Sequence, residues 1–530
     1  MLLWLSVPAL AAMPADLAPG LVPPVQCGMP AFVGLERPPM LDRELLEPAV
    51  GEVPRPPSTS KSLRDAYSVT SNELLTDNFV FRWGNSGGVS TAEVERLAAA
   101  FEEAWSVEID TQGHPLPVGA DTYRFNVYIG SSGGGTPSDG GAAGYFWYDS
   151  RGWPMIVVGA GTLDNGPYAD ITAAHEFYHA IQGGTDRYPY EGDSAWFWEA
   201  SATWASATVY PDNLNYASFL FGYAFLPHYA ANYFNYADSW AVEDFYQYGA
   251  FILPLHLTEL TADRSLVREV WTDTGPERDP LSMLVRLLDE RGLDFNEAFL
   301  DHAARMVTLD YDNEASYQGV LDGYESYFTE SANVVAAQVQ DGNTDGFVDG
   351  PRGLELYRYG YNAIRIDPDG ADTLTLKVRG DSEGSRSNDA EWGARVVVED
   401  GRSRTYFSVE FEGTEGEATV TGLSDETVWL VVSAWTDETE DFDRETFEYS
   451  YSVAPDGEDP VEPEDTGEPE DTGESDTADD SAPTGTGDSG TLSVGTSEPQ
   501  TGGKATGCSV GALTGGAWTL GLLAVARRRR

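Results

Sequence analysis

The sequence is poor in cysteine, in histidine and in positive charge. Its 530 residues include two cysteines, six histidines and 31 Lys or Arg, against 87 Asp or Glu. Cys27 and Cys508 lie near opposite ends of the chain, outside the segments predicted to fold, so disulfide bonds are not expected to hold the fold together. The formal net charge of -56 excludes nucleic acid and anionic lipid headgroups as expected partners, because like charges repel.

The length and composition favour two folded domains with irregular ends. A chain of 530 residues is too long for one ordinary domain, and an apolar fraction of 41% is enough to build buried cores. We expect the chain to divide into a signal peptide at 1–12, an irregular pro-segment or lead-in at 13–65, a first folded domain at 66–330, an acidic connector at 331–352, a β-sandwich at 353–455, a disordered acidic linker at 456–507 and a C-terminal tail at 508–530.

Both ends of the chain indicate export. Residues 2–12 form an apolar run that ends in small residues, as a signal peptide does, although no Lys or Arg precedes it. The alternative is a misassigned start or a buried N-terminal segment. The linker repeats EPEDTG at 462–467 and 468–473 and contains no Lys or Arg, so charge repulsion should keep it extended. The apolar run Ser509–Ala526 is only just long enough to cross a bilayer.

The order of residues in the tail is a more specific signal. Cys508, the apolar run and the cluster Arg527–Arg530 together resemble the C-terminal sorting tails of myxobacterial surface proteins. In that class the tail is processed to leave the protein at the cell surface, so the resemblance implies that Cys508 is the lipidation or sorting residue. The alternative is an uncleaved tail anchor. We therefore expect an exported protein, anchored at the outer membrane surface or extracellular, that meets a membrane only through this tail.

Residues 66–330 show the pattern of an α+β domain. Ser90 and Glu93 have the spacing of a capping box, and a helix should follow them. Residues 167–330 look mostly helical, with clear helical spacing in Ser265–Trp271, Leu281–Arg291 and Phe295–Met306. Short strands are expected at Asn78–Trp83, at the alternating Phe125, Val127 and Ile129 of a half-buried strand, at Tyr145–Tyr148 and at Met155–Val158. A mixed sheet followed by a helical subdomain would leave a cleft between them.

Residues 353–455 change character. Their short runs are β-branched and aromatic, and Gly and Asp turns separate them. This pattern is typical of an all-β sandwich, and it carries no catalytic signature.

The motif His175-Glu176-Phe177-Tyr178-His179 carries the clearest chemistry in the sequence. Asp170 can begin a helix here and Gly183-Gly184 can end it, so both histidines would lie on one face, four residues apart. Two neutral imidazoles in this position can bind one zinc ion, and Glu176 lies beside the first of them as a general base for the attacking water. The alternative is a helix with two hydrogen-bonded core histidines.

A catalytic zinc needs a third protein ligand. Glu199 is a single carboxylate in the apolar and aromatic run Trp196–Trp204, where a buried charge is costly unless it pairs or binds metal. It follows His179 after a stretch long enough for a turn and a second helix. Glu191 and Asp193 are nearby alternatives, but they fall in the polar connection.

With these residues the sequence resembles the gluzincins, the thermolysin-like zinc peptidases, in which HExxH on one helix is followed by a Glu on the next. The resemblance implies His175, His179 and Glu199 as zinc ligands and Glu176 as the catalytic base. HEFYHAIQ and WFWEASATW are closer still to a group of uncharacterised myxobacterial metalloproteases. Thermolysin-like enzymes often carry an Asp four residues after the Glu ligand. Thr203 stands there instead, which implies another partner for the histidine.

The gluzincin pattern also implies a Tyr or His donor that stabilises the oxyanion. Tyr248 is the first choice, with His228 and Tyr246 as alternatives. Met155–Val158 is expected to be an edge strand that pairs with the backbone of an extended substrate. A metzincin would need a third His soon after the motif, and the next one is His228.

Two weaker signals lie outside this region. Asp341, Asn343, Asp345 and Asp349 follow the form of a calcium loop, but an acidic turn between domains would look the same. Gln26–Pro30 loosely resembles a cysteine switch, in which the thiolate of a pro-segment blocks the open position of a zinc ion. The alternative is that Cys27 is simply unpaired.

The sequence as a whole predicts a zincin-like domain, made of a mixed sheet and a helical subdomain, followed by an all-β sandwich. The expected function is an exported, zinc-dependent endopeptidase that hydrolyses protein or peptide substrates, with Zn²⁺ and, through the acidic loop, Ca²⁺ as cofactors. The alternative is an inactive, zinc-containing adhesin that binds through the β-sandwich.

Overall fold

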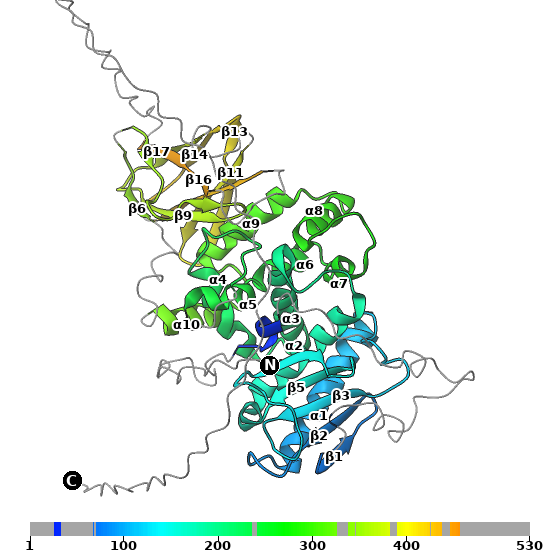
Figure 1. The fold of residues 1–530 in the computed structure, drawn as a ribbon. Coiled ribbons are helices and arrows are strands. Elements are labelled where there is room, and N and C mark those ends of the chain that lie inside the picture. Colours follow the sequence, from blue (N-terminus) through cyan, green and yellow to red (C-terminus); the bar gives the residue numbers. More distant parts are fainter. Residues whose placement is uncertain are drawn as a thin grey trace, which may run out of the picture. The chain divides into compact units, whose positions relative to one another are not determined.

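The computed structural model describes residues 26–32, 67, 70–235, 241–325, 338–344, 346–381, 390–424, 426–436 and 446–455 (Figure 1). All of them belong to one compact unit, Met1–Glu464. The predicted signal peptide, the acidic linker and the tail with Cys508 lie outside the described residues. No helix in the described ranges is long and apolar enough to cross a membrane.

The first domain is built on a mixed five-stranded sheet. Its strands have the order β1-β2-β3-β5-β4, in which β2, β3 and β5 are parallel and the two outer strands are antiparallel to their neighbours. The strands are β1 (Asn72–Leu75), β2 (Phe79–Trp83), β3 (Phe125–Gly130), β4 (Gly144–Tyr148) and β5 (Pro154–Gly159). The four strands predicted from the sequence are therefore present.

Two expectations about these strands are wrong. β3 is not half-buried, because it lies between two parallel neighbours and is buried on both faces except at Asn126. β5, which contains Met155–Val158, is not an edge strand. The chain first runs out to the edge as β4 and then returns to pair with β3, so β4, and not β5, is the strand at this edge of the sheet.

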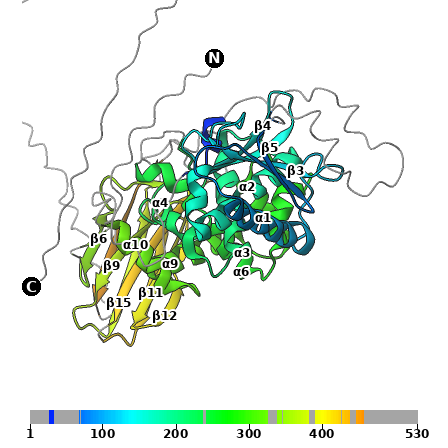
Figure 2. The ribbon, with the colours of Figure 1, turned by 90° about the horizontal axis from the view of Figure 1, so that it is seen from below.

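Helix α1 (Thr91–Trp105) covers one face of this sheet together with the helix that carries the histidines (Figure 2). It begins as predicted, with the Ser90 hydroxyl accepting from the backbone N–H of Glu93 at 3.3 Å and the Glu93 carboxylate accepting from the backbone N–H of Ser90 at 2.7 Å. The ring of Phe79 on β2 packs against Phe101 of this helix and against Phe177 of the histidine helix. The ring centroids are 5.2 Å apart in each pair.

The histidine helix, α2 (Gly166–Thr185), is longer at both ends than the sequence suggested. Asn165 caps its start by accepting a hydrogen bond from the first turn, and Pro167 stands where a missing N–H does no harm. Asp186, in a left-handed conformation, ends it. Asp170 therefore lies inside the helix, because the earlier Asn-Gly-Pro sequence is the stronger start signal.

Gly183-Gly184 also lies inside α2 and does not end it. A Cβ atom at Gly183 would stand 2.6 Å from a ring carbon of Phe146 on β4. Gly183 allows the helix to approach β4 closely, while Gly184 lies against the backbone of Leu116 and Pro117, so both have a packing role.

The helical subdomain follows and confirms the predicted helices to within two residues. Its first helix, α3 (Ala195–Val209), packs against α2 and is buried along its whole length. The other helices are α4 (Leu220–Ala224), α5 (Tyr246–Gly249), α6 (Ile252–Leu260), α7 (Ser265–Thr272), α8 (Pro280–Glu290), α9 (Phe295–Thr308) and α10 (Glu314–Glu325).

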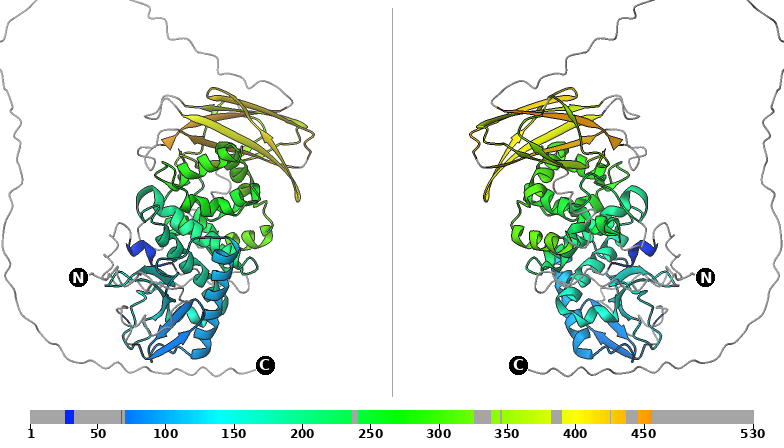
Figure 3. Two further views of the ribbon diagram at one scale, coloured as in Figure 1. Left: turned by 90° about the vertical axis from the view of Figure 1, so that its right-hand side faces the viewer. Right: turned by 90° about the vertical axis from the view of Figure 1, so that its left-hand side faces the viewer.

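The second domain consists of two five-stranded sheets and a short pair made of β8 (Leu356–Tyr357) and β16 (Thr446–Phe447) (Figure 3). All neighbours in the two sheets are antiparallel except β6 and β9. One sheet has the order β13 (Glu410–Glu412), β14 (Glu415–Thr421), β10 (Thr373–Gly380), β17 (Tyr449–Pro455) and β7 (Val348–Asp349). The other sheet has the order β12 (Ser403–Ser408), β11 (Glu391–Asp400), β15 (Thr427–Trp435), β9 (Tyr361–Asp367) and β6 (Gln338–Asp341). The predicted fold class, a mixed sheet with helices followed by a β domain, is confirmed. Two strands, β6 and β7, come from the stretch 331–352.

The sheet that contains β15 is buried on both of its faces. Along β15, Leu430 and Val432 point into the core between the two sheets, while Trp429, Val431 and Trp435 belong to the core of the helical subdomain. This alternation follows from the two-residue period of a strand. The core of the first domain therefore extends onto one face of β15, while a separate core fills the space between the two sheets.

Candidate metal centre

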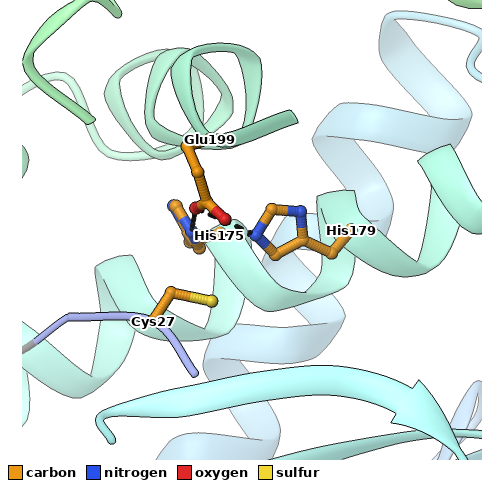
Figure 4. A group of neighbouring side chains, drawn as sticks. All are labelled: Cys27, His175, His179 and Glu199. Atoms are coloured by element: carbon orange, nitrogen blue, oxygen red, sulfur yellow. Dashed lines mark hydrogen bonds and ion pairs between the residues drawn. The ribbon is translucent and has the colours of Figure 1, made fainter. Parts of the chain in front are cut away.

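Helices α2 and α3 bring His175, His179 and Glu199 to one point (Figure 4). The Nε2 atoms of the two histidines are 3.0 Å apart. Glu199 Oε2 lies 3.1 Å from Nε2 of His175 and 3.4 Å from Nε2 of His179. All three side chains are buried between these two helices.

These distances fit a metal ion. Ligands about 2.0–2.1 Å from a zinc ion in a tetrahedral arrangement lie roughly 3.3 Å from one another. The three donor atoms have separations of 3.0, 3.1 and 3.4 Å, and two imidazoles with one carboxylate are a donor set that zinc prefers. Two ring nitrogens directed at the same point cannot both donate, so a cation between them is the natural partner for both.

Neighbouring side chains fix the orientation of His179. Its Nδ1 lies 2.6 Å from Oε1 of Gln182, which can only accept, so in the neutral imidazole the proton is on Nδ1 and Nε2 is available to a metal. The amide nitrogen of Gln182 donates in turn to Ser201 Oγ at 2.9 Å, and Trp271 Nε1 donates to the same hydroxyl at 3.2 Å. This buried chain of hydrogen bonds holds the imidazole in one orientation.

The other two ligands have their own partners. Thr203 Oγ1 lies 3.4 Å from Nδ1 of His175, so the residue that replaces the usual Asp still faces this histidine. The hydroxyl of Tyr190 donates to Oε1 of Glu199 at 2.5 Å, which leaves Oε2 for the metal point. Each of the three ligands is therefore oriented by a different neighbour.

The protonation states of the group suit metal binding. Burial lowers the pKa of His175 to about 4, so its imidazole is neutral at pH 7. Burial opposes ionisation of Glu199, but the charge and hydrogen bonds of the two histidines outweigh it and lower the pKa of Glu199 to about 2. Burial also opposes a charged His179, but the Glu199 carboxylate raises the pKa of this histidine above its usual value. A bound cation would replace that proton.

Glu176 lies beside the group on the side of β4. Burial raises its pKa to about 8, close to the value that suits a general base at neutral pH. A Cβ atom at Gly144 would stand 2.8 Å from Cγ of Glu176, so the absence of a side chain there gives the carboxylate its place. Its Oε2 atom is buried and makes no hydrogen bond within the described part of the chain. The other contacts of this carboxylate are with protein, namely the Cys27 thiol and the backbone of Phe146, so Oε2 can accept one further hydrogen bond.

The fourth member of the group is Cys27. The sequence placed this cysteine outside the folded regions, and that is wrong, because Cys27 is buried in the core of the first domain. Its Sγ and the donor atoms of His175, His179 and Glu199 all lie within 4.8 Å of one another. The thiol also lies close to the carboxylate of Glu176, and burial, followed by the charges of Glu176 and Glu199, raises the pKa of Cys27 above its ordinary value.

Tyr248, on α5, also reaches this site. Its ring centroid is 6.1 Å from that of His175, and its hydroxyl donates to the backbone carbonyl of Cys27 at 3.3 Å. A cavity of about 20 Å³, room for a group the size of one water molecule, lies beside these residues. Its walls include Cys27, His175, Glu176, Phe219 and Tyr248.

A family model matches residues 56–458, which is more than half of the chain. Its description is a family of unknown function, DUF6055. The chain belongs to the DUF6055 family. No curated protein matches it.

Two solved structures resemble parts of this DUF6055 protein. One is the pre-peptidase C-terminal domain of collagenase from Bacillus anthracis, with 14% identity and a TM-score of 0.15, covering 22% of this chain and 94% of that chain. The other is a family GH115 4-O-methyl-α-glucuronidase with specificity for decorated arabinogalactans, with 8% identity and a TM-score of 0.13, covering 56% of this chain and 40% of that chain.

The alternative site residues of the DUF6055 protein lie elsewhere. Glu191 and Asp193 are exposed in the connection between α2 and α3, outside the metal group. The backbone carbonyl of His228 accepts from Tyr357 of the β domain, and the hydroxyl of Tyr246 donates to the carbonyl of Ala230 at 2.9 Å. Neither His228 nor Tyr246 is among the residues that line the site.

The predicted calcium loop falls at the start of the β domain, between β6 and β7. Asn343 and Asp349 are exposed there, while Asp345 and the side chain of Asp341 lie outside the described residues. The calcium site therefore stays a prediction.

Sequence reasoning missed Gln182 and Tyr190, the partners of His179 and Glu199. Gln182 was the easier one to find, because it follows His179 by three residues and so shares its face of α2. Tyr190 lies in an irregular connection, where spacing gives no such signal.

Replacing Gln182 with leucine is expected to weaken zinc binding about 10- to 100-fold, because Nδ1 of His179 loses its acceptor and the ring its fixed orientation. The measurement is a zinc titration in competition with a chelator. Gln112→Leu is the matched control, since this glutamine bonds to Thr208 and not to a histidine. Equal affinity in Gln182→Leu and wild type would contradict the assigned role.

Proposed function

We propose that this DUF6055 protein is a zinc-dependent endopeptidase that hydrolyses peptide bonds in proteins or peptides. The observation that carries the proposal is the meeting of three oriented ligands, His175, His179 and Glu199, with an additional buried carboxylate, Glu176, directed into the same site. A metal held only for structure has no need of that additional acid.

In this proposal each residue has a distinct task. The bound zinc would polarise the scissile carbonyl as a Lewis acid. Glu176 takes the proton from the attacking water and passes it to the leaving amine, and its raised pKa supports both transfers. Tyr248 donates its hydroxyl proton in a hydrogen bond to the carbonyl oxygen, as it does toward the Cys27 carbonyl. The outer edge of β4 supplies backbone partners for an extended substrate.

The test is zinc content and casein cleavage by the full-length protein carrying Cys27→Ser, the variant that removes the thiol from the site. We expect one zinc per chain, cleavage that a chelator abolishes, and recovery when zinc is added back. One zinc per chain without cleavage of casein or of a peptide library would contradict the peptidase.

Cys27 favours a second candidate. With it, four protein side chains surround one point, as in structural zinc sites, which are closed. The second candidate is therefore an inactive surface protein that binds its partner through the β domain. That domain contains a cleft of about 570 Å³ with polar walls that include Arg352, Arg379 and Glu448.

The proposed location follows from the ends of the chain. We propose that the protein is exported and acts at the cell surface or in the medium, on the basis of residues 1–12 and the tail at 508–530. A free active enzyme inside the cell would attack cellular proteins, so a device that delays activity until export would be useful.

A further inference from the structure

The N-terminal segment Gln26–Phe32 contacts the first domain at the metal group. Cys27 precedes His175 by more than a hundred residues, yet its Sγ lies within 4.8 Å of the donor atoms of both histidines and Glu199. Figure 4 shows its side chain directed from a separate segment of chain toward the two histidines. A side chain placed so accurately by so distant a segment is held there by specific contacts.

Those contacts lie along the edge of the sheet. The backbone N–H of Gly28 donates to the carbonyl of Gly144 at 2.7 Å, and the backbone N–H of Ala143 donates to the carbonyl of Gln26 at 3.1 Å. Gly144 is the first residue of β4, the strand at this edge of the sheet. The segment therefore uses the backbone groups that an extended substrate would use.

The carbonyl of Cys27 is bound in the way proposed for the scissile carbonyl of a substrate. It accepts a hydrogen bond from Tyr248 at 3.3 Å, from the hydroxyl proposed to bind the scissile carbonyl. The Gln26 side chain donates to the carbonyl of Asp244 at 3.1 Å, which anchors the segment to the helical side of the site as well. The segment thus spans the site from β4 to the turn before α5.

Glu176 distinguishes this arrangement from a structural metal site. Its carboxylate is buried, one of its oxygens has no hydrogen-bond partner among the described residues, and it contacts the Cys27 thiol. In a structural site the burial of this acid would cost free energy and would serve no purpose. In a blocked catalytic site it is the general base, and it lies beside the group that blocks the metal.

We propose that Cys27 is the fourth ligand of the bound metal and that Gln26–Phe32 occupies the substrate position, so that the full-length protein is latent. The inference rests on the proposed function. Thiolate is a good zinc ligand, and four protein ligands close the coordination shell. When the thiol binds, it gives up its proton, and the Glu176 carboxylate that touches it is the acceptor. Displacement of the segment would open the fourth position and free β4 and Tyr248 together.

The experiment uses full-length protein in a Cys508→Ser background, in which Cys27 is the sole thiol. Cobalt replaces zinc as the probe, because a thiolate bound to Co²⁺ gives a charge-transfer absorption in the near ultraviolet. We expect this absorption in the Cys508→Ser protein and its loss in the protein that also carries Cys27→Ser. We also expect Cys27 to react with a thiol reagent only after the metal is chelated.

Activity provides a separate measurement on the zinc form. A segment that occupies the site in at least nine-tenths of the molecules lowers the rate about tenfold or more, so Cys27→Ser should raise casein cleavage by at least about tenfold. Gly28→Val is a second variant that keeps the thiol. A Cβ at this residue already stands 3.1 Å from that of Ala142, so valine should weaken docking on β4 and give partial activation.

The outcomes separate the two proposals. Absence of the charge-transfer band would overturn Cys27 as a ligand. A band together with equal cleavage before and after Cys27→Ser would overturn the latency while the peptidase stands. A band with no cleavage by any variant would overturn the peptidase and with it the latency, and Cys27 would then be a ligand of a structural metal.

Discussion

Replacing Glu176 with glutamine is expected to reduce peptide cleavage about 10²- to 10⁴-fold while one zinc per chain remains bound. Glutamine has nearly the same shape but cannot accept the proton of the attacking water. Because Glu176 is not one of the three principal ligands, the metal should stay. The comparison is made in the Cys27→Ser protein, so that the N-terminal segment does not mask the difference.

The matched control for this substitution is Glu108→Gln. Glu108 is also fully buried, and burial raises its pKa, but it interacts with Tyr178 and lies outside the metal group. A general effect of losing a buried acid would appear in both variants. Cleavage by Glu176→Gln at the rate of the parent protein, with zinc bound, would show that another group acts as the base.

Replacing Glu199 with alanine is expected to abolish stoichiometric zinc binding and to lower the free energy of unfolding by about 3–5 kcal/mol. Its carboxylate is buried and bonded to His175 and to Tyr190, so truncation leaves both partners unpaired in the interior. Denaturant unfolding followed by tryptophan fluorescence measures the stability, and a zinc titration measures the binding.

Two comparisons separate the contributions to this loss. Unfolding of both proteins in the presence of a chelator removes the stabilisation that comes from bound zinc and leaves the effect of the broken contacts. Glu191→Ala removes an exposed carboxylate from the nearby connection and should change little. If Glu199→Ala bound zinc as tightly as wild type, Glu199 would not be a ligand.

The sequence was informative where chemistry follows helical spacing. The four-residue interval between His175 and His179 places two imidazoles on one face, whatever the rest of the fold does. Glu199 could be identified because a carboxylate in an apolar run needs a partner. Both inferences depend on local geometry or on local composition, and the structure brings these three residues together.

The parts that could not be predicted depend on long-range pairing. The order of β4 and β5 is decided by which strand pairs with β3, and the Gly-rich connection permits either order. The position of Cys27 depends on contacts with Ala143 and Gly144, far along the chain, and the sequence indicates it only through the loose resemblance of Gln26–Pro30 to a cysteine switch. The start of α2 was misplaced for a different reason, since Asn165 and Asp170 are both good caps and the proline that follows Asn165 makes the earlier start the stronger one.

The sheet that contains β15 has a consequence for how the protein is made. One face of this sheet, with Trp429, Val431 and Trp435, completes the core of the helical subdomain. A nascent chain that has emerged only as far as α10 still lacks that covering, so its helices expose apolar surface until the last strands leave the ribosome. The metal group, although its residues come from the first half of the chain, can therefore mature only when synthesis is almost complete, by which time the N-terminal segment with Cys27 has long been available to contact it.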